Sequence, residues 1–213
     1  MKFTVFHSPC TFAIIDDWMS LEDNQQIFTR YLPNQIRYLL PSKVGTNRGS
    51  VIASSAKSSK NLWLYQHEMQ YPSTPKLSKL FEKYMWGDEN CKAIKSVNDN
   101  LFQASLFTNH STLLLSQYVE NDHYEWHRDY SPMLTANYMF CTEPKKFQGG
   151  EFLIGAWNST TIEKIIPFKN NRLILFPSRI YHKVNAVHSF SGEALDARFT
   201  LQYWCQLKHR QET

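Results

Sequence analysis

The sequence Trp126-His127-Arg128-Asp129 lies within a long succession of short strand-like segments, and these segments set the expected architecture. From Leu113 onward, short apolar runs alternate with turn signals such as Gly149-Gly150 and Asn170-Asn171. The segments predicted as strands are residues 113–119, 135–141, 151–156, 160–166, 172–176 and 197–205. Many short strands in succession are typical of a sandwich or jelly roll. We therefore expect a mainly β fold with flanking helices (α+β).

His127 and Asp129 are two residues apart, so in an extended strand their side chains face the same side. A second imidazole can come from His182, which lies in the strand-like segment 176–184. Two histidines and one carboxylate form the facial triad that binds Fe(II) and leaves coordination positions open. A His-x-Asp pair by itself is weak, because chains of this length contain one by chance. The prediction therefore depends on the ordered context of all three residues.

The first 105 residues carry helical and irregular signals. The expected elements are a short strand at 12–18, a helix that follows Asp17 or Ser20 and ends at Pro33, and an amphipathic helix after Thr74-Pro75. Residues 42–60 are rich in Ser, Lys, Gly and Asn, so we predict a loop there, which could act as a mobile lid. The helices of this half are expected to cover one sheet of the β half.

Size and composition are those of one domain. The chain has 213 residues, of which 42% are hydrophobic. No apolar run approaches the roughly 18 residues that span a bilayer, and the N-terminal residues do not resemble a secretory signal. The four cysteines are far apart and form no Cys-x-x-Cys pair, which argues against a zinc or redox motif. These features predict a reduced, cytoplasmic setting and no membrane.

Positive charge is scattered along the chain, and the net charge is only +4. Two local clusters occur, Lys57 with Lys60 and Lys145-Lys146. Such clusters usually lie on a solvated surface, and we predict this for both. Charge alone therefore does not indicate nucleic-acid binding.

The order of motifs after His127-Arg128-Asp129 carries more information than any single one. Gly149-Gly150-Glu151, the apolar run 173–177, His182 and Arg198 follow in turn. In this order, residues 113–205 resemble the Fe(II)- and 2-oxoglutarate-dependent dioxygenases, specifically the prolyl-4-hydroxylase-like branch. The resemblance implies a double-stranded β-helix (jelly roll) with iron at one open end. It also implies a single domain over 1–213, in which 1–105 supports a catalytic core at 106–208.

The resemblance implies that His127, Asp129 and His182 are the iron ligands. It implies that Arg198 pairs with the distal carboxylate of 2-oxoglutarate, which suits a planar guanidinium. In the last predicted strand, Arg198 shares a polar face with Thr200, Gln202 and Trp204, while the opposite face is apolar. The polar face suits a cofactor cavity, and the apolar face suits packing against helices.

Four further residues receive weaker assignments. Thr200 could donate to the same carboxylate, and Tyr118 matches a tyrosine that lies beside 2-oxoglutarate in this branch. Tyr124, three residues before His127, and Trp204 are assigned to the substrate entrance. A core tyrosine remains the alternative for Tyr118 and Tyr124.

His188 competes with His182 for the second histidine position. The sixteen residues from His182 to Arg198 are more than the family usually has, and His188 lies only ten residues before Arg198. We prefer His182 because the Phe-Pro-Ser run before it and Lys183-Val184 after it match the family context. Residues 189–196 are then expected to lengthen the hairpin between the last two strands.

The resemblance implies hydroxylation of a C–H bond, with O2 consumed, 2-oxoglutarate converted to succinate and CO2, and ascorbate as a candidate reductant. The substrate would be a protein residue, proline-like, or a free amino acid or other small metabolite, and the sequence does not choose between them. Related halogenases have a small residue at the position of Asp129. The carboxylate present here therefore favours hydroxylation.

Two alternatives remain open. Nucleic-acid demethylases of the same superfamily carry a second arginine six residues after the first, where this chain has Trp204, so oxidative nucleobase demethylation is less expected. The chain could also be a jelly-roll metal-binding protein that does not turn over 2-oxoglutarate. Arg198 distinguishes a 2-oxoglutarate-dependent enzyme from this second alternative, because a site that binds only a metal would not need a buried guanidinium beyond the metal. The sequence leaves the oligomeric state undetermined.

Overall fold

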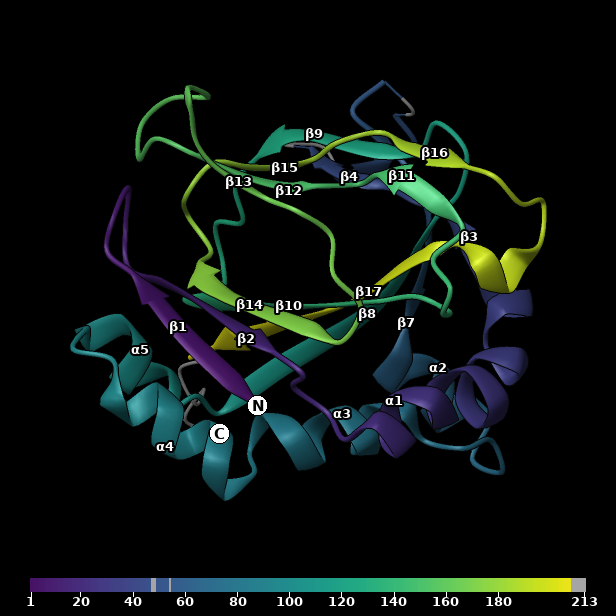
Figure 1. Cartoon of the computed structure of the whole chain (residues 1–213), viewed down its shortest axis with the longest axis horizontal. Helices are drawn as coiled ribbons and strands as arrows, with labels where there is room; N and C mark the ends of the chain where they lie inside the picture. Colours follow the sequence, from purple (N-terminus) through teal and green to yellow (C-terminus); the bar gives the residue numbers. More distant parts are fainter. Residues whose placement is uncertain (47–48, 54, 208–213) are drawn as a thin grey trace.

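The computed structural model describes residues 1–46, 49–53 and 55–207, and in this part of the chain two antiparallel sheets face each other. Figure 1 shows the larger sheet between the smaller sheet and a layer of helices. The helices therefore cover the outer face of the larger sheet only. This is the α+β jelly-roll architecture expected from the sequence.

The larger sheet has eight strands in the order β1-β2-β14-β10-β17-β8-β7-β3. Their bounds are β1 Lys2–Phe6, β2 Phe12–Asp16, β14 Arg172–Pro177, β10 Leu134–Phe140, β17 Arg198–Gln206, β8 His110–Tyr118, β7 Lys60–Trp63 and β3 Leu40–Pro41. The predicted strands at 113–119, 135–141, 172–176 and 197–205 correspond to β8, β10, β14 and β17. The four N-terminal strands extend this sheet at both edges, so the first half of the chain contributes strands as well as helices.

The smaller sheet has five strands in the order β13-β12-β15-β9-β6. Their bounds are β13 Ile162–Ile166, β12 Phe152–Gly155, β15 His182–Val184, β9 His123–His127 and β6 Lys57–Ser58. Two strand pairs accompany the main sheets, β11 Phe147–Gly149 with β16 Val187–Ser189 and β4 Val44–Thr46 with β5 Gly49–Val51. The antiparallel pairing of β15 with β9 places His182 directly opposite His127.

The helices are short and lie in the first half of the chain. Their bounds are α1 Leu21–Gln26, α2 Leu64–Gln70, α3 Leu77–Met85, α4 Asp88–Ser96 and α5 Asn100–Ser105. Ser20 caps α1 by accepting the backbone N–H of Asp23 at 3.1 Å, and Asp17 instead adopts a positive φ of 53°. The helical path continues through a π turn at Ile27–Tyr31 and a 3₁₀ turn that contains Pro33, and a second 3₁₀ turn follows at Ile36–Tyr38.

Alternation along β17 divides the interior into two cores. Phe199, Leu201 and Tyr203 pack in the core between the larger sheet and the helices. Arg198 and Thr200 are on the opposite face, towards the smaller sheet. Both faces of this strand are therefore buried, and its inward face is polar as predicted.

The prediction of a loop at 42–60 is wrong in part. Four strands, β4 to β7, lie wholly or partly within this range, and residues 47, 48 and 54 are outside the described residues. These strands are short and polar, and two of them form by pairing with distant strands, β6 with β9 and β7 with β8. Local periodicity cannot detect pairing of this kind. Among the described residues, no helix is long and apolar enough to cross a membrane.

Candidate active site

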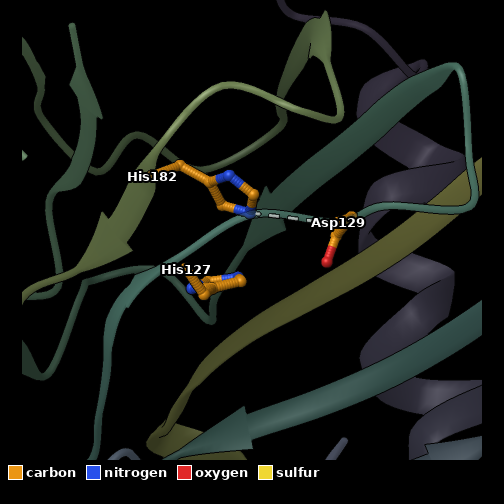
Figure 2. Close-up of side chains that lie close together, drawn as sticks. All are labelled: His127, Asp129 and His182. Carbon is orange, nitrogen blue, oxygen red and sulfur yellow. Dashed lines mark ion pairs between the residues drawn. The ribbon is translucent and has the colours of Figure 1, made fainter. Parts of the chain in front are cut away.

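His127, Asp129 and His182 converge at one end of the space between the two sheets (Figure 2). One ligand atom from each residue lies within 4.8 Å of the other two. His182 Nε2 is 3.8 Å from Asp129 Oδ2, and the two imidazole ring centroids are 4.0 Å apart. This spacing suits three ligands on one side of a metal ion, and His, His and carboxylate are the donor set of non-haem Fe(II) sites.

Strand pairing and a bend after β9 bring these residues together. His127 is the last residue of β9 and His182 is the first of β15, so the register of the two strands fixes the imidazole pair. Asp129 lies two residues beyond β9, where its backbone N–H donates to the carbonyl of Ser178 at 2.9 Å. The carboxylate is thus held in a bend rather than within the strand that the sequence pattern predicts.

Both imidazoles present Nε2 to the centre of the site. His127 Nδ1 lies 2.7 Å from the carbonyl oxygen of Glu125, and His182 Nδ1 lies 2.9 Å from that of Ile180. A carbonyl can only accept, so each Nδ1 carries the proton and each Nε2 offers a lone pair. Burial, followed by the repulsion that two protonated imidazoles would have at this distance, lowers the pKa of His127 well below its usual value. Burial also lowers the pKa of His182. Both rings are therefore neutral, as metal binding requires.

Trp204 contacts the carboxylate directly. Its indole Nε1 donates to Asp129 Oδ2 at 2.8 Å, while its ring also lines the cavities in front of the triad. The sequence places Trp204 only at the substrate entrance. In the structure it is also a positioning residue, because an indole N–H that donates to a carboxylate ligand restrains that ligand's orientation.

Arg198 is fully buried between the sheets and has no carboxylate partner within ion-pair distance in the described chain. Its Nε donates to the carbonyl of Gly150 at 2.9 Å and its Nη2 contacts Met139 Sδ at 3.6 Å, but Nη1 has no partner. The guanidinium lies over the Tyr118 ring at 4.9 Å. Burial lowers the pKa of Arg198 to about 10, so the group stays charged at neutral pH.

Two more polar groups near Arg198 are buried without a hydrogen bond. They are Tyr118 Oη and Thr200 Oγ1, and Tyr118 lies directly opposite Arg198 in the pairing of β8 with β17. Burial raises the pKa of Tyr118 to about 12, so the phenol remains a donor. An uncompensated buried cation beside unpaired hydroxyls is costly. A carboxylate ligand would satisfy all three groups, so the residues fit the distal end of 2-oxoglutarate.

The turn at Gly149-Gly150 makes room for the guanidinium. Gly150 has a φ of +69°, and a Cβ built on it would lie 2.6 Å from Arg198 Cδ. A side chain at this position would therefore both strain the backbone and displace Arg198. The glycine pair, interpreted from sequence as a simple turn, also shapes the Arg198 pocket.

Tyr124 lies where the sequence suggests, in front of the triad. Its ring stacks on the His127 ring with centroids 3.4 Å apart, and it lines two cavities of about 910 and 310 Å³ that both reach His127 and Asp129. His188 lies elsewhere. It is on β16 with its side chain 61% exposed, and it pairs with Glu120 at 3.8 Å. The geometry therefore brings His182, and not His188, to the site.

Sequence reasoning missed Lys57. The structure contradicts its predicted surface location, because only 4% of Lys57 is exposed and its Nζ lies 4.3 Å from the centre of the Tyr124 ring. Burial lowers the pKa of Lys57 to about 8, and the charge of Asp129 opposes this effect, so the ammonium form predominates at neutral pH. Lys57 lies in a polar stretch, and nothing in its neighbouring sequence signals burial.

Asn137 was also missed. It is fully buried, and neither atom of its amide has a hydrogen-bond partner. It lies opposite Gln202 in the pairing of β10 with β17, on the inward face that also carries Arg198. The polar lining between the sheets is therefore larger than the sequence suggested.

A family model matches the part of the chain that contains this site. Residues 113–206 match the model of the 2OG-Fe(II) oxygenase superfamily, a range that includes the triad, Arg198 and Trp204. Over these residues the chain is similar to the 2OG-Fe(II) oxygenase superfamily. Lys57 lies outside the matched range.

One relative and several solved structures are similar to this chain over most of its length. An uncharacterized PKHD-type hydroxylase from Synechocystis sp. is 26% identical over 94% of this chain, and the chain spans 64% of that relative's length. A prolyl-4-hydroxylase from Pseudomonas putida superimposes with a TM-score of 0.60 at 13% identity, covering 92% of both chains. A prolyl hydroxylase from Trichoplax adhaerens, solved with a hypoxia inducible factor peptide, has a TM-score of 0.56 at 15% identity, with 92% and 83% covered. At these identities the two solved structures establish the shared fold.

Proposed function

We propose that this protein is an Fe(II)- and 2-oxoglutarate-dependent hydroxylase that acts on a C–H bond of a protein residue, with a proline-like residue as the leading candidate. The observation that carries the proposal is the buried Arg198, which has no carboxylate partner yet lies on the strand that runs to the metal triad. A site that only bound a metal would not need this cation. The co-substrate's distal carboxylate is the partner that it lacks.

The chain's own residues position the reactants. His127, Asp129 and His182 would hold the metal on one side, and the carbonyls of Glu125 and Ile180 keep both imidazoles in the metal-binding tautomer. Trp204 orients the Asp129 carboxylate. Fe(II) with 2-oxoglutarate supplies the activation of O2 that C–H hydroxylation requires. The protein supplies geometry and a largely enclosed interior.

The shape of the site supports a polypeptide substrate. The larger cavity, of about 910 Å³, is an open groove that leads to His127 and Asp129. Its aromatic lining consists of Trp63, Tyr124, Trp126, Tyr130, Tyr181 and Trp204. Aromatic side chains provide large contact areas for an extended peptide. The names of the relatives, PKHD-type hydroxylase and prolyl-4-hydroxylase, point to the same reaction. A free amino acid or small metabolite remains the alternative substrate.

The test is an anaerobic titration of metal-free protein with Fe(II) and 2-oxoglutarate, monitored by the visible charge-transfer band of the chelated co-substrate. We expect the band in wild-type protein and in His188→Ala, and its loss in His182→Ala and Arg198→Ala. His188→Ala is the matched control because its imidazole lies on the surface. Succinate release with peptides that contain proline, with and without ascorbate, then tests turnover.

Wild-type protein that binds Fe(II) but shows no band with 2-oxoglutarate would contradict the proposal and indicate a metal-binding jelly roll instead. Loss of the band in His188→Ala, with retention in His182→Ala, would contradict the ligand assignment. Succinate release stimulated by free amino acids and not by peptides would contradict the choice of a protein residue.

A further inference from the structure

Lys57 is a second buried cation near the triad. It lies on β6, opposite Tyr124 on β9, and its carbonyl accepts the hydroxyl of Ser42 at 3.3 Å. The chain is therefore fixed where Lys57 enters the interior. The charge of Lys57 acts on all three triad residues, since it lowers the pKa of His127 and His182 and is itself influenced by Asp129.

The contacts of the Lys57 ammonium are neutral. They are the face of the Tyr124 ring at 4.3 Å and the side-chain oxygen of Asn61 at 3.2 Å, with the Asn61 amide oriented so that its nitrogen donates to Ser116. Within the described residues, no carboxylate lies at ion-pair distance from Lys57 Nζ. A ring face and an amide oxygen compensate a buried ammonium only in part.

A cavity of about 310 Å³ joins Lys57 to the triad. Lys57, Asn61, Gln202, His127 and Asp129 all line it, and the exposed Lys43 lies on its wall as well. Arg198, Tyr118 and Thr200, the groups assigned to the distal carboxylate of 2-oxoglutarate, are not among the residues that line it.

Lys57 would lack a counterion even when the metal and 2-oxoglutarate are bound. A divalent metal, the Asp129 carboxylate, the Arg198 guanidinium and dianionic 2-oxoglutarate together carry no net charge. Lys57 then leaves one positive charge in a poorly solvated cavity, and one further carboxylate would neutralise it. Lys43 adds positive charge that would attract such a group.

We propose that Lys57 binds a carboxylate of the primary substrate in this cavity, so that the hydroxylated position lies close to an acidic group. The inference rests on the proposed function, because it takes the Arg198 pocket to be filled by 2-oxoglutarate. Lys57 is then a substrate-binding residue, and the cavity is a specificity subsite. The carboxylate could come from an acidic side chain of a peptide or from the end of a chain or free amino acid.

The test measures binding directly. Protein loaded with Mn(II) and saturating 2-oxoglutarate is titrated with three probes, and paramagnetic relaxation of the probe protons is recorded by NMR. Acetyl-Asp-amide carries only a side-chain carboxylate, acetyl-Gly carries only a terminal carboxylate, and acetyl-Asn-amide is the neutral control. We expect saturable relaxation of at least one acid and none of the neutral probe. The acid that binds more tightly identifies the source of the carboxylate.

Lys57→Met should weaken binding of that acid by at least about tenfold, because a charge-assisted hydrogen bond contributes roughly this much. Lys57→Arg, which keeps the charge, should retain most of the binding. Lys60→Met is the matched control, because Lys60 is exposed and does not line the cavity. Metal-free Lys57→Met should also melt at a higher temperature than wild type, since it removes a poorly compensated buried charge.

Three results would overturn the inference. The acids could bind no more tightly than acetyl-Asn-amide, or equally to wild type and Lys57→Met. Lys57→Met could also lose the charge-transfer band with Fe(II) and 2-oxoglutarate, which would assign Lys57 to the co-substrate. In each case, the charge-transfer band of wild-type protein with Fe(II) and 2-oxoglutarate tests the proposed function independently of Lys57.

Discussion

Two buried cations, Arg198 and Lys57, lie in the interior, and they differ in how they are built into the fold. Arg198 begins β17, a central strand of the larger sheet, and its guanidinium contacts Gly150, Met139 and Tyr118. Lys57 belongs to the two-residue edge strand β6 of the smaller sheet. The superfamily match includes Arg198 and stops short of Lys57. We infer that β17, in the larger sheet, contributes the co-substrate binding shared by the superfamily, while the edge strand β6 contributes a feature particular to this chain.

The largest effect should come from removing the guanidinium. We expect Arg198→Met to weaken 2-oxoglutarate binding about 100-fold, because the co-substrate loses charge-assisted hydrogen bonds in a buried site. Lys57→Met should leave 2-oxoglutarate binding within a few-fold of wild type. Isothermal titration of Mn(II)-loaded protein measures both. If both variants lose the same 2-oxoglutarate affinity, both cations bind the same ligand, and the distinction between Arg198 and Lys57 is wrong.

Trp204 connects the Arg198 strand to the metal. Trp204→Phe removes the hydrogen bond to Asp129, and we expect metal affinity to fall by about 10- to 100-fold, as for other partners of metal ligands. Trp63→Phe is the control, because its ring lies 5.7 Å from the Trp204 ring and lines the same cavities without this hydrogen bond to Asp129. Competition with a fluorescent chelator gives both affinities. Equal affinities would show that Asp129 needs no such restraint.

A substitution at Gly150 tests whether the residues around Arg198 can adjust to an added methyl group. Gly150→Ala places a methyl group against Arg198 in a positive-φ conformation, and we expect a loss of about 1–3 kcal/mol in the free energy of unfolding. Gly192→Ala is the control, because a Cβ added there would meet no neighbour within 4 Å and the φ of Gly192 is not in the positive range. Urea denaturation measures both variants. If Gly150→Ala unfolds like the control, the pocket is more adaptable than its geometry indicates.

The smallest effect concerns a single hydroxyl. Thr200 Oγ1 is buried without a partner, so Thr200→Val should slightly stabilise the metal-free protein. The same change should weaken 2-oxoglutarate binding roughly three- to tenfold if the hydroxyl donates to the co-substrate. Thermal unfolding measures the change in stability, and calorimetry measures the change in 2-oxoglutarate affinity. A variant whose 2-oxoglutarate affinity is unchanged would remove Thr200 from the co-substrate pocket.

The central strands were predictable because their local pattern and their final environment agree. β10, β14 and β17 are continuous or alternating apolar segments bounded by turns, and the sheet buries them on both faces. β1, β3 and β6 were not predicted. They are two to five residues long and lie at or next to the sheet edges, so long-range pairing rather than intrinsic preference determines them.

In the candidate site, too, local sequence predicted some features, while others depend on contacts between distant residues. The spacing of His127 and Asp129, and the order of His182 and Arg198 after them, are properties of the sequence and were enough to predict which side chains converge. The hydrogen bond from Trp204 to Asp129 joins residues 75 positions apart, so no local pattern could reveal it. The same reason explains why the role of Gly150 beside Arg198 emerged only from the structure.

The amino-acid sequence predicted a sandwich or jelly roll from the periodicity of its strands, and with the family resemblance it predicted that His127, Asp129 and His182 lie together. Tertiary structure decided the tautomers of the two histidines, the orientation of Asp129 and the burial of Lys57. Each of these depends on contacts between segments that the chain brings together only on folding. Burial is a property of the assembled interior, and Lys57, although it lies in a polar stretch, is buried because the two sheets close around it.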